Sequence, residues 1–135
     1  MKDIIRERVL RMRRSVDAVS AATASAKVCA TLSTMDLPSP IAVYLSADGE
    51  IDIDNFILNA LHSGARVVAP RWNGSEYELS ELKSLESAAL RSGPHGIREP
   101  AAREVVHPSE VGSWLVPGVA FTRGHSRLGY GGGWY

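Results

Sequence analysis

Two short apolar runs on either side of a helical segment constrain the fold most strongly. Residues 41–46 form a short apolar run of the kind that buried parallel strands present on both faces, and residues 66–70, apolar after Arg66, predict the next strand. Between them, residues 51–62 place apolar side chains at helical spacing, and Gly64 ends the segment. Strand, helix and strand in this order predict a βαβ unit with a right-handed crossover.

The remaining segments extend this pattern into one α/β domain. Residues 5–19 repeat apolar side chains at steps of four and three, which predicts a helix that packs by this stripe, and residues 20–32 form a second helix. Asn73-Gly74 predicts a tight turn before a returning strand at residues 77–82. We expect mostly loop over residues 83–110 and another buried strand over 114–121. The prediction is a three-layer α/β/α domain with a mostly parallel sheet, spanning residues 1–135.

Composition narrows the class of protein but not its function. The 135 residues have no net charge, one cysteine and no apolar stretch long enough to cross a membrane, so we expect a cytoplasmic protein without membrane contact. Six basic and two acidic side chains fall in residues 1–14. Such a basic helix attracts an anionic ligand, the acidic remainder of the chain or nucleic acid, and charge alone leaves all three open.

Ligands of open α/β sheets bind where the carboxyl ends of strands meet loops. Here that rule indicates the loop with Asp48 and Glu50, and the loop that leads from Phe121 into a glycine-rich tail. In this tail, four glycines follow Arg127 between positions 129 and 133. Glycine lets backbone amides approach phosphate oxygens, and arginine donates two parallel hydrogen bonds to them. A flexible chain end explains the same glycines, and neither common nucleotide motif is matched.

The residues of the tail, 127–135, together with 116–121, closely resemble the signature of the 5-formyltetrahydrofolate cyclo-ligase family, also called methenyltetrahydrofolate synthetases. Lys2 and Arg6 resemble its Lys-x-x-x-Arg, residues 44–52 its strand before Glu-Ile-Asp, and residues 96–100 its Gly-Ile-x-Glu-Pro. The resemblance implies a ligase of folate and one-carbon metabolism. Such an enzyme uses ATP and Mg²⁺ to convert 5-formyltetrahydrofolate to 5,10-methenyltetrahydrofolate through a phosphorylated formyl intermediate.

The resemblance also implies the site residues. Arg127 is expected to act in catalysis. The expected ATP-binding residues are Lys2, Arg6, Arg127, Leu128, Gly129, Tyr130, Gly131, Gly132, Gly133, Trp134 and Tyr135. The expected folate-binding residues are Leu45, Glu50, Tyr130, Gly131, Gly132, Gly133 and Trp134. A carboxylate such as Glu50 suits the N–H groups of a pterin ring.

The family pattern continues with an aspartate that helps to hold Mg²⁺, and this position lies beyond Tyr135. The sequence therefore assigns no metal ligand, and we expect an incomplete domain without the family's last strands and with weakened magnesium binding. An uncovered sheet edge would favour self-association.

Two other functions remain open at this point. One is a remnant of the family that binds nucleotide or phosphate without turnover. The other is a nucleic-acid-binding module that uses the basic first helix, but a neutral chain without a recognised nucleic-acid motif argues against it. We therefore expect no nucleic-acid partner.

Overall fold

The computed structural model describes residues 1–47 and 49–135; Asp48, predicted to lie at the ligand edge, is outside the described residues. The helices are α1 (Lys2–Arg14), α2 (Ala18–Ser33) and α3 (Asp54–His62). The strands are β1 (Ile41–Ala42), β2 (Val67–Trp72), β3 (Tyr77–Leu82), β4 (Leu90–Ser92), β5 (Arg98–Pro100), β6 (Val105–Val106), β7 (Ser113–Trp114), β8 (Ala120–Phe121) and β9 (Arg127–Leu128). Single 3-10 turns occur at Ser87–Ala89, Pro94–Gly96 and Pro108–Glu110.

Five strands form the main sheet in the order β6-β3-β2-β1-β7. β1 is parallel to β2 and to β7, whereas the β2–β3 and β3–β6 pairs are antiparallel. The α/β class is confirmed, and the expectation of a mostly parallel sheet is supported only in part, because the sheet is mixed. The cause is the Asn73-Gly74 turn, where Gly74 has φ +99° and the Asn73 side chain accepts two amide hydrogen bonds, so that β3 returns along β2.

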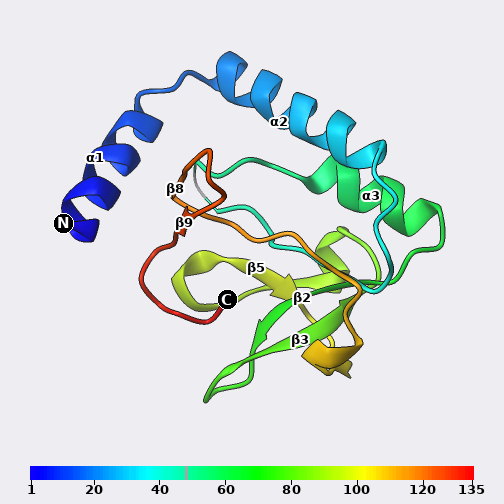
Figure 1. Ribbon diagram of the computed structural model, residues 1–135. Coiled ribbons are helices and arrows are strands. Elements are labelled where there is room, and N and C mark those ends of the chain that lie inside the picture. Colours follow the sequence, from blue (N-terminus) through cyan, green and yellow to red (C-terminus); the bar gives the residue numbers. More distant parts are fainter. Residues whose placement is uncertain (48) are drawn as a thin grey trace.

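The two faces of this sheet carry separate apolar clusters. α2 and α3 cover one face (Figure 1), where Ile57 and Val67 are fully buried in the main core. The side chains of Val68 and Leu79 point to the other face and pack with Val111, which belongs to the segment after β6. Because successive strand residues face opposite sides, the continuous apolar run in β2 supplies both clusters.

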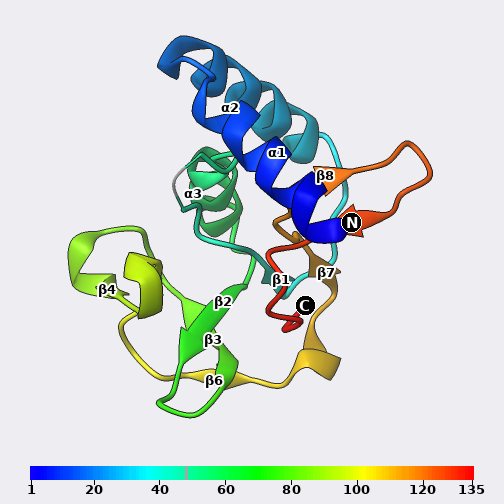
Figure 2. The same cartoon turned by 90° about the vertical axis from the view of Figure 1, so that its left-hand side faces the viewer.

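Helix α1 lies at one side of the molecule (Figure 1) and faces the viewer in Figure 2, and none of its residues belongs to these clusters. Within α1, which is described in full, no residue is buried, and Met12 is 61% exposed. The prediction that α1 packs by its apolar stripe is therefore wrong. Instead, Arg6 and Arg13 attach the helix to the tail through hydrogen bonds.

Residues 83–110 contain more regular structure than predicted, because β4 and β5 form a small antiparallel sheet and β6 joins the main sheet. The strand expected over residues 114–121 is interrupted. Its first part is β7 beside β1, and its last part is β8, which pairs with β9 as a hairpin. This hairpin delivers the chain into residues 129–135, called the glycine tail below.

Candidate functional site

The glycine tail begins against helix α1. The Nε of Arg6 donates a hydrogen bond to the carbonyl oxygen of Gly129 at 2.8 Å, and the same guanidinium pairs with Asp3. The Arg6 side chain is only 18% exposed, although it belongs to a surface helix. Two segments at opposite ends of the sequence therefore meet around one arginine.

A second arginine of α1 reaches the tail and the loop after β1. The Nη2 of Arg13 donates to the phenol oxygen of Tyr130 at 2.8 Å, and this hydroxyl lies 3.4 Å from Oε2 of Glu50, to which it donates. The other oxygen, Glu50 Oε1, accepts from the amide of Ala47 at 2.6 Å. Burial and the nearby Glu50 carboxylate raise the pKa of Tyr130, while the hydrogen bond from Arg13 acts in the opposite direction. Tyr130 thus connects α1, the tail and the Glu50 loop.

Arg127 lies at the base of the tail. Its Nε donates to the carbonyl oxygen of Pro117 at 2.6 Å, and its guanidinium stands 5.6 Å from the centre of the Tyr135 ring. A Cβ on Gly129 would lie 2.8 Å from Nη2 of Arg127, closer than a carbon approaches a nitrogen. A glycine at position 129 therefore leaves room for the arginine head.

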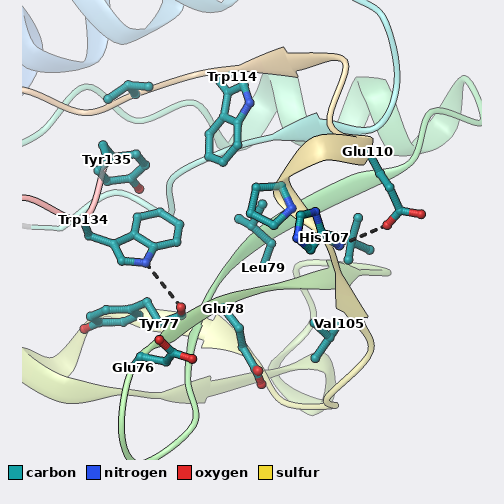
Figure 3. Close-up of a pocket in the computed structure, with 13 residues that line it drawn as sticks. Glu76, Tyr77, Glu78, Leu79, Val105, His107, Glu110, Trp114, Trp134 and Tyr135 are labelled. Carbon is teal, nitrogen blue, oxygen red and sulfur yellow. Dashed lines mark hydrogen bonds between the residues drawn. The ribbon is translucent and has the colours of Figure 1, made fainter.

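The far end of the tail packs on the main sheet. The indole Nε1 of Trp134 donates to the carbonyl oxygen of Tyr77 at 3.3 Å, and the two rings lie 6.0 Å apart, edge to face. Trp134 also contacts Trp114 and Tyr135. These aromatic rings line an open groove of about 930 Å³ (Figure 3), whose other wall includes His107.

Comparisons with known proteins agree on one family. The sequence model of the 5-formyltetrahydrofolate cyclo-ligase family matches residues 1–135. The chain belongs to this family. It is similar to a probable 5-formyltetrahydrofolate cyclo-ligase of Caenorhabditis elegans, with 30% identity over 102 residues, which are 70% of this chain and 50% of the relative. The chain thus spans about half the length of this curated relative.

Two solved structures are also similar to this cyclo-ligase family member. The 5,10-methenyltetrahydrofolate synthetase of Aquifex aeolicus shares 30% identity with a TM-score of 0.84, covering 99% of this chain and 69% of that one. The 5,10-methenyltetrahydrofolate synthetase of Mycoplasma pneumoniae shares 20% identity with a TM-score of 0.71, covering 96% of this chain and 71% of that one, a likeness in fold.

The other residues expected at the site of a cyclo-ligase lie at different depths. Lys2 is exposed at the first position of α1. The side chain of Leu45 belongs to the main core and is 4% exposed, so only its backbone is available to a ligand. Leu128 is half-buried in β9, and residues 131–133 are exposed.

Two site features escaped the sequence reasoning. One is the bridge from Arg13 to Tyr130, although Arg13 shares a helix face with Arg6. The other is Arg98 of β5, which binds both carboxylate oxygens of Asp54, at 2.8 and 3.1 Å, and lies 3.4 Å from Oγ of Ser46. The hydrogen bonds to Asp54 raise the pKa of Arg98. Arg98 therefore supports the loop that carries Glu50.

The residues around the tail suit a phosphate group better than a metal ion. Arg6, Arg13 and Arg127 supply guanidinium groups near the glycines. Among residues 1–47 and 49–135, no group of three histidine, cysteine or acidic side chains could hold a metal ion. In the same residues, no helix has the length and apolarity that a membrane crossing requires.

Proposed function

We propose that this family member catalyses the ATP-dependent conversion of 5-formyltetrahydrofolate to 5,10-methenyltetrahydrofolate through a phosphorylated formyl intermediate. The observation that carries the proposal is the junction at Tyr130, where α1, the glycine tail and the Glu50 loop meet through hydrogen bonds. This junction gathers an anion-binding set of arginines and a carboxylate within one region. ATP and a folate need both kinds of group.

The arginines serve the nucleotide in this proposal. Arg6, Arg127 and Lys2 neutralise phosphate oxygens, and the glycines let backbone amides approach the same oxygens. The transferred phosphoryl group requires positioning and charge neutralisation more than covalent help from the protein. Arg127 is the residue that we assign to catalysis, because its guanidinium lies beside the glycines at the base of the tail.

In this proposal the folate binds next to the Glu50 carboxylate. The Glu50 carboxylate accepts hydrogen bonds from pterin N–H groups, and Tyr130 and Trp134 offer aromatic faces to the ring or to the nucleotide base. Transfer of the terminal phosphoryl group of ATP to the formyl oxygen releases ADP and turns this oxygen into a good leaving group. N10 then attacks the activated carbon and loses its proton to solvent, and the C–O bond breaks as phosphate departs. No step is assigned to Mg²⁺, because the described residues do not provide a carboxylate cluster for it.

The activity is tested by mixing the protein with ATP, magnesium and 5-formyltetrahydrofolate and following the absorbance of the methenyl product. We expect product formation that requires ATP. Tight ATP binding without product at high protein concentration would contradict the proposal and favour a family member that binds nucleotide without turnover. Binding to nucleic acid that weakens steeply with salt would instead favour a nucleic-acid-binding module that uses the basic helix α1.

The ATP site is tested by calorimetric titration of three variants. Arg127→Ala removes the proposed phosphate ligand, and Gly129→Ala displaces the same guanidinium, since the new Cβ would lie 2.8 Å from Nη2. We expect Arg127→Ala to weaken ATP binding about tenfold or more, the loss of roughly one charge-assisted hydrogen bond, and Gly129→Ala to weaken it less, because the flexible arginine head moves aside. Gly124→Ala is the matched control, because Gly124 lies outside the glycine tail and its Cβ would meet only Oγ1 of Thr122, at an ordinary distance of 3.8 Å. Equal affinities in all three variants would exclude the assigned role of Arg127.

A further inference from the structure

An ion pair between a buried glutamate and an exposed arginine, next to the end of β2, has no role in the proposed chemistry. Glu99 of β5 is 2% exposed, and its Oε1 accepts from Nε of Arg91 at 2.6 Å. Its Oε2 accepts from the backbone amide of Trp72 at 3.0 Å, and Arg91 donates in turn to the carbonyl oxygen of Trp72. The pair therefore binds both backbone groups of the last residue of β2, as a neighbouring strand would do.

Gly93 leaves space for the Glu99 carboxylate because it has no side chain. A Cβ on Gly93 would lie 2.3 Å from Oε2 of Glu99, so no larger residue fits there without moving the carboxylate. A charged group that is buried at this depth requires complete pairing, and Glu99 obtains it from Arg91 and Trp72. Removing the charge of Glu99 therefore weakens the only side-chain acceptor that the amide of Trp72 has in the described contacts.

Trp72, which the ion pair holds, is connected to the glycine tail through Tyr77. Trp72 is the cross-strand partner of Tyr77, and their rings lie 5.0 Å apart, edge to face. Tyr77 in turn receives the indole hydrogen bond and the ring edge of Trp134. Figure 3 shows Trp134 above Tyr77, with the indole nitrogen directed at the Tyr77 backbone.

The tail needs such a support, because its own backbone restricts it little. Gly131 and Gly133 have φ of +102° and +70°, a region that glycine enters freely but also leaves freely. At Gly132, a Cβ would meet no neighbouring atom within 4 Å. The orientation of Trp134 is consequently set by its contacts with Tyr77 and the neighbouring rings, rather than by the chain that precedes it.

We propose that Glu99, together with Arg91, is a positioning residue for the glycine tail. The ion pair fixes the Trp72–Tyr77 pair at the end of the hairpin, this pair orients Trp134, and Trp134 orders the tail for its ligand. That the ligand is ATP or folate rests on the proposed function, whereas the positioning of Trp134 does not depend on it.

The test follows the indole N–H resonance of Trp134 in the ¹⁵N-labelled protein, assigned by its loss in a Trp134→Leu variant. Glu99→Gln keeps the size of the side chain but replaces the ion pair with Arg91 by a weaker hydrogen bond to a neutral amide. We expect the Trp134 resonance to move toward the position of an unstructured indole, and its exchange with water to become roughly three- to tenfold faster, the effect of one weakened hydrogen bond.

The matched control is Glu81→Gln. Like Glu99, Glu81 is a largely buried acid that pairs with an arginine, Arg66. It lies on β3 opposite Val68, away from the tail. Its substitution should leave the Trp134 resonance unchanged. A folded Glu99→Gln protein with an unchanged resonance, or an equal shift in both variants, would overturn the proposal.

A second variant covers the case in which Glu99→Gln does not fold. Arg91→Lys keeps the positive charge on a 40% exposed side chain but loses the second hydrogen bond to Trp72, and we expect a smaller shift in the same direction. An unshifted resonance in this variant would also overturn the proposal. Because no substrate is added, a failure of the proposed enzymatic activity leaves this result interpretable.

If the enzyme is active, kinetic measurements can distinguish a role of Glu99 in positioning Trp134 from a role in stabilising the hairpin alone. Glu99→Gln should raise the KM values in the wild-type background, and it should have little further effect in the Trp134→Leu background, because both substitutions interrupt the same chain of contacts. Additive effects would indicate that Glu99 stabilises the hairpin independently of Trp134 and would overturn the positioning role.

Discussion

Tyr44 and Tyr130 both donate hydrogen bonds to the segment that carries Glu50. The hydroxyl of Tyr44 donates to the carbonyl oxygen of Ile51 at 2.8 Å, and that of Tyr130 donates to Glu50 itself. Burial raises the pKa of Tyr44 from its ordinary value of 10.0 to about 12, and the negative charge of Glu50 adds to this effect. The neutral phenol is therefore the form that the folded protein stabilises.

This pKa shift predicts a loss of stability at alkaline pH. Between about pH 10 and 12 the unfolded chain releases the Tyr44 proton while the folded protein retains it, so the free energy of unfolding falls as pH rises through this window. In Tyr44→Phe this part of the decline should disappear, leaving a shallower curve in urea denaturation measured from about pH 8 upward. Equal slopes in the two proteins would contradict the assignment. At about pH 8 the variant should lose only about 1 kcal/mol, for the hydrogen bond to Ile51.

At the scale of elements, α1 is an amphipathic helix that is held by arginines. Its docking therefore depends on a few polar contacts instead of an apolar interface. Exposed or partly exposed hydrogen bonds of this kind contribute modestly and weaken independently of the core.

We expect Arg13→Ala to loosen α1 without unfolding the sheet. The substitution removes the hydrogen bond to Tyr130 and the stacking on its ring, 5.7 Å away. Backbone amides of residues 2–14 should exchange with deuterium roughly three- to tenfold faster, and those of β2 should not change. Arg8→Ala, an equal loss of charge at an exposed position of the same helix, is the control. Equal exchange in the two variants would rule out a docking role for Arg13.

The elements differ in how much the sequence determined them. The βαβ order and the Asn73-Gly74 hairpin were predictable, because local periodicity and turn chemistry specify them. The apolar stripe of α1 led to the wrong prediction that this face is buried, because apolar spacing predicts a helix but not the partner against which it packs. Strands β4 to β6 were missed since each has two or three residues, and Arg98–Pro100 holds a proline and charges that disfavour strands.

The candidate site likewise contains residues that the sequence predicted and contacts that it did not predict. The family motif drew attention to Arg6, Glu50 and the tail, and the structure brings Arg6 and Glu50 to the tail. Their roles in binding stay predictions. The contacts of Glu99 were not predictable, because a buried acid in a loop-like segment reveals its partners only when β2, β4 and β5 are placed together.

For the molecule as a whole, the main core lies between the sheet and helices α2 and α3, and no described residue of the glycine tail belongs to it. Ile57 of α3 is fully buried, whereas its neighbour Leu58 is 42% exposed. Stability and ligand binding should therefore respond to different substitutions.

Ile57→Ala should lower the free energy of unfolding by about 2–5 kcal/mol, through the lost burial and the cavity that remains. Leu58→Ala should change it by less than about 1 kcal/mol, and neither should alter the indole resonance of Trp134 while the protein remains folded. Urea denaturation measures both values. A similar loss in the two variants would show that α3 is not packed as described.

The contacts from α1 to the tail join residues that are more than a hundred positions apart, as in the Arg6 to Gly129 bond with a separation of 123. Closing so long a loop costs chain entropy that nothing in α1 offsets early in folding, whereas the β2–β3 hairpin forms from neighbours. We expect the sheet to assemble first and the tail junction last. During synthesis, the ribosome would release the complete β1–β3 region before it exposes Tyr130, so the newly made protein acquires its fold before it can recognise a ligand.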